Sequence, residues 1–415
     1  MAKIGYKLGI GFYKVALQAA APFNEKAALF LKGRKNVFED LKKAFDGNTS
    51  PVAWFHCASL GEFEQGRPII EEFRREYPTY KVLVTFFSPS GYEVRKNYDQ
   101  ADVVCYLPLD TAANAKKLLD IVNPAIAFFV KYEFWHYYLA ELKKRNIPTL
   151  SVSAIFRQGQ AFFKPYGGFY RNILKNLTHI FVQDQTSADL LTGIGLRNVT
   201  VAGDSRFDRV KQVVDSRKDL PIAQAFKNNQ KTLVIGSSWQ PDIEVISKGL
   251  ENIGEELKII IAPHEIADAS LTKTEEAFSG KKIIRYSKAS VDTVATYDIL
   301  LIDNIGMLTS LYQYGDFAYV GGAFGKGLHN ILEAATYGMP VIFGSKYAKF
   351  KEARDLVALK GVFSINNVQE FHMQFEKLFE NETERQKAGD ICKQYVKENT
   401  GATAEILNFC KRLLK

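Results

Sequence analysis

Two carboxylates stand where apolar segments in the first half of the chain end. Glu62 follows the run VAWFHCAS, in which a strand candidate leads through a glycine turn into a helix that Glu62 opens. Glu133 comes shortly after the apolar run Ala125–Val130, in the motif KYEFW. Because the carboxyl ends of parallel strands share one rim of a sheet, both side chains are candidates for proton transfer. The helix dipole alone favours an acid in a first helical turn. It is therefore the position at a strand end that makes Glu62 a candidate.

A glycine-rich segment in the second half, DFAYVGGAFGKGLHNILEAATYGMPVIFG (316–344), predicts a strand, a glycine turn, a helix that starts near His329, and another strand. Glycines let the backbone approach an anion, and the free N–H groups of a helix start favour phosphate. Glu333, four residues after His329, would share its helical face and could accept a ribose hydroxyl. The spacing fits neither G-x-x-x-x-G-K-[ST] nor G-x-G-x-x-G, which argues against an ATPase or a simple nicotinamide enzyme.

Other polar residues follow further strand candidates, and each is a weak signal alone. They are Arg206 in GDSRFD, Ser237 and Ser238 in GSSWQPD, His264 in IAPHE, and Gly306 in DNIGML. Because the loops after consecutive strands of one sheet converge, so many polar strand ends predict a single active site.

The elements that must position these residues are apolar, β-branched runs that alternate with helical stretches. Continuous apolar runs are typical of a parallel sheet covered on both faces, so the sequence predicts a doubly wound α/β fold. The pattern stops at a charge-rich stretch, Asp204–Lys231, and then restarts, which predicts two such halves with a ligand cleft between them. The strand candidates are Val52–Cys57, Lys81–Phe86, Val103–Leu107, Ala125–Val130, Thr149–Val152, His179–Val182, Val199–Ala202, Thr232–Ile235, Leu257–Ala262, Lys282–Arg285, Ile299–Ile302, Phe317–Val320 and Pro340–Phe343.

Composition excludes several classes of protein. With 415 residues, 47% hydrophobic and 24% charged, the chain is long enough for two or three globular domains and is neither disordered nor fibrous. Its 4 cysteines are scattered without a short pairing interval, which argues against a disulfide framework and a cysteine metal site and favours a reducing compartment. The net charge of +8 suggests an anionic partner, and most of this excess lies in the first fifty residues.

The N-terminal segment predicts an interfacial helix. Charges interrupt its apolar sequence too often for a clean transmembrane span, and a signal peptide fits poorly. At helical spacing three lysines form one edge and four apolar side chains form an adjoining stripe, a pattern that suits the headgroup layer of an anionic membrane. A helix packed on its own domain is an equally weighted alternative. The lysines are Lys3, Lys7 and Lys14, and the apolar residues are Ile4, Leu8, Phe12 and Val15.

Taken together, the motifs ASLGE, KYEFW, GDSRFD, GSSW, IAPHE, DNIGMLTSLY, YVGGAF and HNILEAATYGMPVIFG resemble those of the 3-deoxy-D-manno-octulosonic acid (Kdo) transferases, which add Kdo to lipid A precursors. They occur in family order from about residue 52 to 344. The resemblance implies the GT-B fold, two Rossmann-like domains that face each other across a cleft. It also implies a metal-independent, inverting glycosyltransferase that uses CMP-Kdo as its donor substrate and needs no further cofactor.

The resemblance also implies roles for individual residues. Glu62 corresponds to the general base, and Glu133 to the acid that helps bind the sugar or stabilise the transition state. Arg206 corresponds to a lysine of the family, so the charge is kept while the hydrogen-bonding shape changes from a point charge to a planar fork. The residues implied in CMP-Kdo binding are Ser237, Ser238, His264, Asp303, Gly306, Met307, His329, Asn330 and Glu333.

The resemblance further implies a division of labour along the chain. We expect a basic membrane-associating segment (1–50), an acceptor-binding domain (51–205), a linker (206–230), a CMP-sugar-binding domain (231–390), and a C-terminal helix (391–415) able to pack back on the first domain. The expected partners are CMP-Kdo, a membrane-embedded lipid A precursor and the anionic inner-membrane surface, without nucleic acid. The expected location is the cytoplasmic side of the inner membrane of a Gram-negative bacterium, peripheral or monotopic.

Three alternatives are considered, one among enzymes and two from other classes of function. Another GT-B transferase or a sugar-nucleotide epimerase would use a UDP-sugar and would prefer uridine nucleotides to CMP. A nucleic-acid binder would account for the positive charge, although no RNA-binding motif is evident. A purely lipid-tethering protein would leave the polar residues at the strand ends without a purpose.

Overall fold

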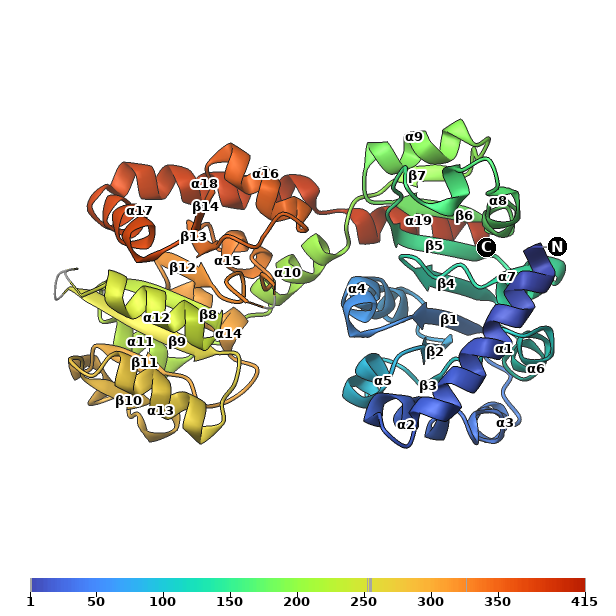
Figure 1. Ribbon diagram of the computed structural model, residues 1–415, viewed down its shortest axis with the longest axis horizontal. Coiled ribbons are helices and arrows are strands. Elements are labelled where there is room, and N and C mark those ends of the chain that lie inside the picture. The colour runs from blue at the N-terminus through green and yellow to red at the C-terminus, as the bar shows by residue number, and fades with distance from the viewer. Residues whose placement is uncertain (1, 252, 254–255, 326, 415) are drawn as a thin grey trace. The chain divides into compact units, whose positions relative to one another are not determined.

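The computed structural model describes residues 2–251, 253, 256–325 and 327–414. Contacts within the chain divide it into two compact units. Unit 1 comprises residues 1–209 and 400–415, and unit 2 comprises residues 210–399. Each unit is built on its own parallel sheet with helices on both faces, as predicted from the alternating apolar runs (Figure 1).

The sheet of unit 1 has seven parallel strands in the order β3-β2-β1-β4-β5-β6-β7. All side chains of β1, β4 and β5 are buried, as expected of strands covered on both faces. The strands are β1 (Val52–Cys57), β2 (Lys81–Phe86), β3 (Val103–Tyr106), β4 (Ile126–Val130), β5 (Thr149–Ala154), β6 (His179–Val182) and β7 (Val199–Val201).

Alternate residues of the central strands of unit 1 build two separate cores. Trp54 and Phe129 point to one face, where they meet the helices that follow β3 and β4. Phe55 and Phe128 point to the other face and stack on each other at 4.3 Å. The helices that begin in this unit are α1 (Ala2–Ala20), α2 (Glu25–Lys32), α3 (Val37–Phe45), α4 (Leu60–Glu76), α5 (Pro89–Arg95), α6 (Ala112–Val122), α7 (His136–Lys144), α8 (Gly168–Leu174), α9 (Gln185–Gly193), α10 (Arg206–Asp215) and α19 (Ala402–Leu413).

Unit 2 repeats this architecture with the strand order β10-β11-β9-β8-β12-β13-β14. Its strands are β8 (Lys231–Ser238), β9 (Leu257–Pro263), β10 (Ile283–Arg285), β11 (Ile299–Leu301), β12 (Phe317–Val320), β13 (Val341–Gly344) and β14 (Val362–Ile365). Its helices are α11 (Pro221–Lys227), α12 (Gln240–Gly249), α13 (Asp268–Ala277), α14 (Leu308–Leu311), α15 (Leu332–Thr336), α16 (Lys351–Leu359), α17 (Val368–Glu380) and α18 (Glu382–Asn399). Every strand that the apolar runs predict is present, and β14 is a further, half-buried strand at the sheet edge.

Each sheet has one point where the strand order reverses. In unit 1 the chain runs outward from β1 to β3 and then returns to β4, which lies on the other side of β1. In unit 2 the corresponding strands are β8 and β12. A crevice opens beyond the carboxyl ends of two such strands because their connections leave in opposite directions. Each unit therefore carries its own topological switch point, where ligands of open α/β sheets bind.

The stretch 206–230, predicted as a linker from its charge, contains α10 and α11. Ala223 and Phe226 of α11 are fully buried, so this part of the stretch belongs to the hydrophobic interior of unit 2. The charged residues between the apolar positions of these short amphipathic helices account for the polar composition.

The C-terminal helix α19 packs on unit 1, against α4 (Figure 1). Ile406, Leu407 and Cys410 of α19 are buried in the same core as Phe55. The carboxylate of Asp208 accepts hydrogen bonds from the N–H groups of Gly401 (2.6 Å) and Thr403 (2.7 Å), so it caps the first turn of this helix.

Candidate active site

Glu62 lies in the first turn of α4, directly after β1, which is one of the two strands at the switch point of unit 1. Its carboxylate accepts a hydrogen bond from the Ser59 hydroxyl. The Lys131 ammonium, at the end of the other switch-point strand β4, lies 3.8 Å from Glu62 Oε1. Lys131 has a positive φ of 69°, a strained conformation for a residue with a side chain, and such strain is concentrated at functional sites.

Glu133 follows β4 and is held by two side chains. Its Oε2 accepts a hydrogen bond from Trp135 Nε1 (2.6 Å) and lies 3.0 Å from His56 Nε2. His56 is fully buried in β1, and its Nδ1 lies 2.9 Å from the hydroxyl of Thr85 on β2. Both contacts are made by the same oxygen of Glu133, Oε2, and together they orient its carboxylate.

The two carboxylates lie at the same end of β1. Burial raises the pKa of the Cys57 thiol, at the last position of β1, well above its usual value, and the negative charges of Glu62 and Glu133 raise it further. The geometry agrees, because Lys131, two residues before Glu133, lies 3.8 Å from Glu62, and β1 pairs directly with β4. The ASLGE and KYEFW motifs thus follow neighbouring strands at one edge of the sheet.

Arg206, the first residue of α10, also belongs to unit 1. Its Nε and Nη2 lie 2.8 and 2.7 Å from Oδ2 of the nearly buried Asp204. The backbone N–H of Arg206 donates to the other oxygen of Asp204 at 3.0 Å. This ion pair orients the guanidinium at the start of the helix.

The switch point of unit 2 is tied together by one buried carboxylate. Asp242, which is almost fully buried, accepts from the N–H of Trp239 after β8 and from the N–H of Gly322 after β12, each at 2.9 Å. It also accepts from the hydroxyl of Tyr319 at 2.9 Å. At Gly321 an added Cβ would come within 2.5 Å of the backbone at Ser237, so this close approach of the two strand ends requires glycine.

Ser237 and Ser238 shape the end of β8. The register between β8 and β9 shifts between Gly236 and Ser238, and Ser237 has a positive φ of 52°. Ser238 is buried, and His264 at the end of β9 donates its backbone N–H to the Ser238 carbonyl at 2.9 Å. The bulge redirects the chain into Trp239, a residue that was not among the predicted site residues.

Three aromatic rings meet at this switch point. The ring centroids of Trp239 and His264 are 4.3 Å apart, and those of His264 and His329 are 4.7 Å apart, with nearly parallel planes in both pairs. The indole N–H of Trp239 donates to Nε2 of His329 at 3.1 Å. The structure thus brings His264 and His329, predicted separately, into one stack.

The predicted helix start at His329 is wrong. Helix α15 begins at Leu332 and is five residues long. The N–H groups of Gly325 and Gly327 donate to the Gly322 carbonyl, and the N–H of His329 donates to Gly321. Because the glycine loop satisfies these donors internally, they do not form the predicted backbone cradle for a phosphate.

The argument that placed Glu333 on the helical face of His329 fails for the same reason. Glu333 instead accepts from the Thr309 hydroxyl (2.6 Å) and from the side-chain amide of the exposed Asn330 (3.1 Å). The carboxylate of Glu333 is therefore oriented by polar groups of α14 and of the preceding loop.

The last predicted group, Asp303, Gly306 and Met307, lies in the loop between β11 and α14. Asp303 accepts from the backbone N–H of Ser287 at 3.0 Å and from its hydroxyl. Gly306 has a φ of 93°, a conformation that favours glycine, and Met307 directly precedes α14.

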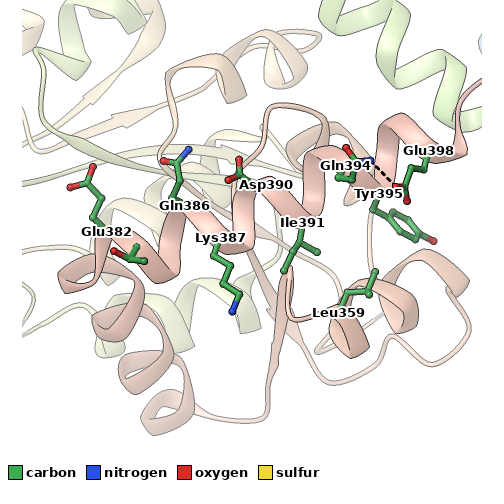
Figure 2. A pocket seen from close by; sticks show the side chains of 10 residues that line it. Leu359, Glu382, Gln386, Lys387, Asp390, Ile391, Gln394, Tyr395 and Glu398 are labelled. Atoms are coloured by element: carbon green, nitrogen blue, oxygen red, sulfur yellow. Dashed lines mark hydrogen bonds between the residues drawn. The ribbon is translucent and has the colours of Figure 1, made fainter.

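A pocket of about 860 Å³ lies elsewhere in unit 2, along α18 and the end of α16, and Figure 2 shows that mainly polar and charged side chains line it. None of the predicted site residues is among those lining it, which are Leu359, Glu382, Thr383, Gln386, Lys387, Asp390, Ile391, Gln394, Tyr395 and Glu398. Across residues 2–251, 253, 256–325 and 327–414, no three His, Cys, Asp or Glu side chains are grouped as metal ligands would be.

Comparison with known proteins identifies relatives of the whole chain. Residues 33–209 match the family model described as 3-deoxy-D-manno-octulosonic-acid transferase (kdotransferase). The chain is 29% identical to the 3-deoxy-D-manno-octulosonic acid transferase of Chlamydophila psittaci over 73% of this chain and 71% of that protein. It is 28% identical to the enzyme of the same name from Aquifex aeolicus (80% and 88%) and 26% identical to that of Haemophilus influenzae (89% and 90%).

Solved structures confirm the fold. UDP-GlcNAc 2-epimerase from Neisseria meningitidis, bound to UDP-GlcNAc, superposes with a TM-score of 0.61 at 16% identity, covering 87% of this chain and 100% of that one. MurG from Acinetobacter baumannii has a TM-score of 0.57 at 11% identity, with coverages of 88% and 99%. At such identities the likeness shows the two-domain GT-B architecture alone.

Proposed function

We propose that the chain, which is similar to Kdo transferases over most of its length, is a glycosyltransferase that moves Kdo from CMP-Kdo to a lipid A precursor of the lipid IVA type, with inversion. The reaction belongs to lipopolysaccharide core biosynthesis. The observation that carries the proposal is the position of Glu62 and Glu133 after β1 and β4, the two strands at the switch point of unit 1. A transferase that forms a glycosidic bond needs a carboxylate at the acceptor hydroxyl, and this rim supplies two.

Glu62 acts as the general base. It takes the proton of the acceptor hydroxyl while the new bond to C2 of Kdo forms and the bond from C2 to the CMP phosphate breaks, so CMP leaves as the anion. Ser59 and Lys131 orient the Glu62 carboxylate from two directions, which holds it ready for the hydroxyl. Inversion follows because the acceptor attacks the face of the sugar opposite to the departing phosphate.

Glu133 stabilises the positive charge that develops on the sugar. Its carboxylate is fixed by Trp135 and His56, so no reorientation is required as the charge appears. A preorganised negative group close to an oxocarbenium-like carbon lowers the barrier without forming a bond to it.

Unit 2 binds the CMP part of the donor. The side chains of His329, Asn330 and Glu333, rather than backbone N–H groups of the glycine loop, contact the phosphate and the ribose. The ring stack supports this proposal because it holds His329 at the switch point, where nucleotides bind in α/β sheets, and Asp242 holds the backbone on which Trp239 and the glycine loop lie. Arg206 adds positive charge for the departing phosphate.

Helix α1 delivers the lipid-linked acceptor. One face of α1 packs on unit 1, since the Tyr6 hydroxyl donates to Asp110 (2.6 Å) and the ring of Tyr13 stacks on Phe87. The opposite face exposes apolar side chains at 61–76%, namely Ile4, Leu8, Phe12 and Val15. The same helix thus packs on its domain and presents an apolar stripe of the kind that inserts among lipid headgroups, and both alternatives from the sequence are compatible.

A chain of contacts connects the packed face of α1 with Glu133. Phe87, which stacks on Tyr13, also packs against Trp135 with ring centroids 4.7 Å apart, and Trp135 donates to Glu133. An acceptor anchored in a membrane under α1 would therefore reach the carboxylates without leaving the lipid surface. No helix within the described residues is long and apolar enough to cross a bilayer.

The central experiment is a product assay. The protein is incubated with CMP-Kdo and lipid IVA, and the lipid product is weighed by mass spectrometry. We expect a mass gain of one or more Kdo residues and the release of CMP. An unchanged lipid, together with binding of UMP or UDP in preference to CMP, would assign the chain to the UDP-sugar enzymes instead.

The membrane contact is tested by replacing exposed apolar side chains of α1 with negatively charged ones. Leu8→Asp combined with Phe12→Asp should weaken sedimentation with vesicles of phosphatidylglycerol by about tenfold or more, since burial of one such side chain contributes about 1.5–3 kcal/mol. Met373→Asp on α17 is the control, because Met373 is also an exposed apolar residue, at 61%, but lies in unit 2. Equal sedimentation of the α1 variant and the control would contradict the proposal.

A further inference from the structure

The indole of Trp239 controls the proton of His329. We propose that Trp239 is a positioning residue that selects the tautomer of His329 in which Nδ1 carries the hydrogen, and that this N–H is the group that binds the donor phosphate. The second half of the proposal rests on the proposed function, whereas the tautomer itself does not.

The hydrogen bond between the two rings determines the tautomer. An indole nitrogen has a hydrogen and no lone pair available in the ring plane, so Trp239 Nε1 can only donate. Its partner, His329 Nε2 at 3.1 Å, must therefore be the acceptor and carries no hydrogen. A neutral imidazole has one N–H, and here it is at Nδ1.

The surroundings keep this histidine neutral. Burial lowers the pKa of His329, and the neighbouring His264 ring lowers it further. The imidazolium form would carry hydrogens on both nitrogens and would lose the bond from the indole. Trp239 and His264 therefore both favour the neutral ring.

A half-turn of the His329 ring would also break its hydrogen bond with Trp239. His264 covers one face of His329, and Gly322 lies against its edge so closely that an added Cβ would come within 2.8 Å of His329 Cδ2. A half-turn of the imidazole would place a carbon opposite the indole N–H. The orientation of His329 is thus set by a hydrogen bond and by packing together.

Asp242 fixes the donor of this bond in turn. It accepts from the backbone N–H of Trp239 and from that of Gly322, so one buried carboxylate holds both the indole and the loop that leads to His329. In the Ser-His-Asp triad a carboxylate fixes the histidine by accepting from its Nδ1–H, whereas here an indole N–H that donates to Nε2 selects the same tautomer from the other side of the ring.

The tautomer matters because the ligand is an anion. With Nδ1–H, His329 offers a hydrogen to a phosphate oxygen. With the hydrogen on Nε2, it would present a lone pair to the same oxygen, which is repulsive. The indole N–H of Trp239 is used within the protein, so its effect on the phosphate passes through His329.

The experiment measures the tautomer directly in protein with ¹⁵N-labelled imidazole rings. The chain has 6 histidines, and the His329 signals are identified by their loss in His329→Gln. In the wild type at pH 7.5 we expect the ¹⁵N shifts of a ring protonated at Nδ1. Shifts of a ring protonated at Nε2 would overturn the proposal without any variant being made.

Trp239→Phe keeps an aromatic ring and removes the N–H. We expect the ¹⁵N shifts of His329 to move toward a mixture of tautomers and the affinity for CMP, measured by calorimetry, to fall about tenfold, since a hydrogen bond to a charged group contributes about 1.5–3 kcal/mol. His264→Phe is the matched control, because it keeps the stack and the indole donor. It should leave the His329 tautomer unchanged.

Two results would overturn the proposal. One is an unchanged tautomer in Trp239→Phe, and the other is a changed tautomer with unchanged CMP affinity. If the wild type binds UDP and not CMP, the proposed function fails, and the same pair of variants titrated with UDP tests the role of Trp239 separately.

Discussion

The two units use one architecture for different chemistry. Both place their candidate residues at the switch point of a seven-stranded parallel sheet. In unit 1 this point gathers carboxylates, Glu62 and Glu133, which are oriented by polar side chains. In unit 2 the switch point has aromatic rings beside a glycine-rich loop. The buried carboxylate there, Asp242, accepts hydrogen bonds from backbone N–H groups.

The difference shows that the fold determines where a site lies, and that the side chains at that site determine its chemistry. The proton acceptor proposed for unit 1 must remain accessible, and the side chain of Glu62 is 18% exposed. The anion-binding histidine proposed for unit 2 must instead keep one tautomer, and the stacked ring of His264 packs against it. We therefore expect substitutions in unit 1 to act on turnover and those in unit 2 to act on nucleotide binding.

The largest expected effect separates these two roles. Glu62→Gln should lower kcat by about 10²–10⁴-fold, because the general base is lost, while the CMP affinity measured by calorimetry stays unchanged. Glu64→Gln is the control on the same helix, since Glu64 pairs with Arg95 at 2.7 Å. An active Glu62→Gln enzyme would remove Glu62 from the role of base.

The second prediction concerns the stability of each unit. Leu407→Ala on α19 should destabilise unit 1 by about 2–5 kcal/mol, since it opens a cavity in a fully buried core. Hydrogen exchange resolved along the chain should show weaker protection in β1 and β2 and unchanged protection in β8 and β12. Asn408→Ala, at an exposed position of the same helix, should change neither. Equal loss of protection in both units would contradict the prediction that each unit has its own stability.

The third prediction asks whether unit 1 also contributes to the phosphate. Arg206→Ala should lower kcat/KM by roughly 10- to 100-fold, since hydrogen bonds between charged groups contribute about 1.5–3 kcal/mol. Arg206→Lys keeps the charge and should lose less. Arg209→Ala is the control, because Arg209 pairs with Glu71 at 3.2 Å. Near-normal turnover of Arg206→Ala would confine phosphate binding to unit 2.

The smallest expected effect is a pH dependence of stability. Burial lowers the pKa of His179 in unit 1 and of His329 in unit 2. Below a pH of about 6.5 the unfolded chain binds more protons than the native one, so both units should lose stability as the pH falls from that value toward the lowered pKa. His179→Gln should flatten the dependence measured for unit 1 alone, and His329→Gln that for unit 2 alone. A variant that flattens the dependence of the other unit would show that the units are coupled.

The sequence was sufficient to predict the two parallel sheets because strands buried on both faces are continuously apolar, as β1 and β4 show. It also predicted that Glu62 and Glu133 follow strands whose carboxyl ends share one edge of the sheet, and these strands, β1 and β4, are direct neighbours. The linker was predicted from net polarity, which conceals the buried Ala223 and Phe226 of α11. Amphipathic spacing of these residues was the signal that could have revealed the helix.

The details of unit 2 depend on contacts between residues distant in sequence. Glycines before His329 suggested a helix start with free N–H groups. In the structure these N–H groups donate hydrogen bonds to the carbonyls of Gly321 and Gly322. His56 and Trp239 were missed because their importance lies in partners 77 and 90 residues away. His56, a single polar residue within the apolar run VAWFHC, was the more visible of the two.

The placement of α19 has a consequence for biosynthesis. Ile406, Leu407 and Cys410 complete a core whose other members come from the first half of the chain. A ribosome finishes all of unit 2 before it makes these residues, so the usual order in which the N-terminal domain matures first is reversed here. Until then, during the synthesis of roughly half the polypeptide, the nascent first unit exposes the apolar surface that α19 will cover.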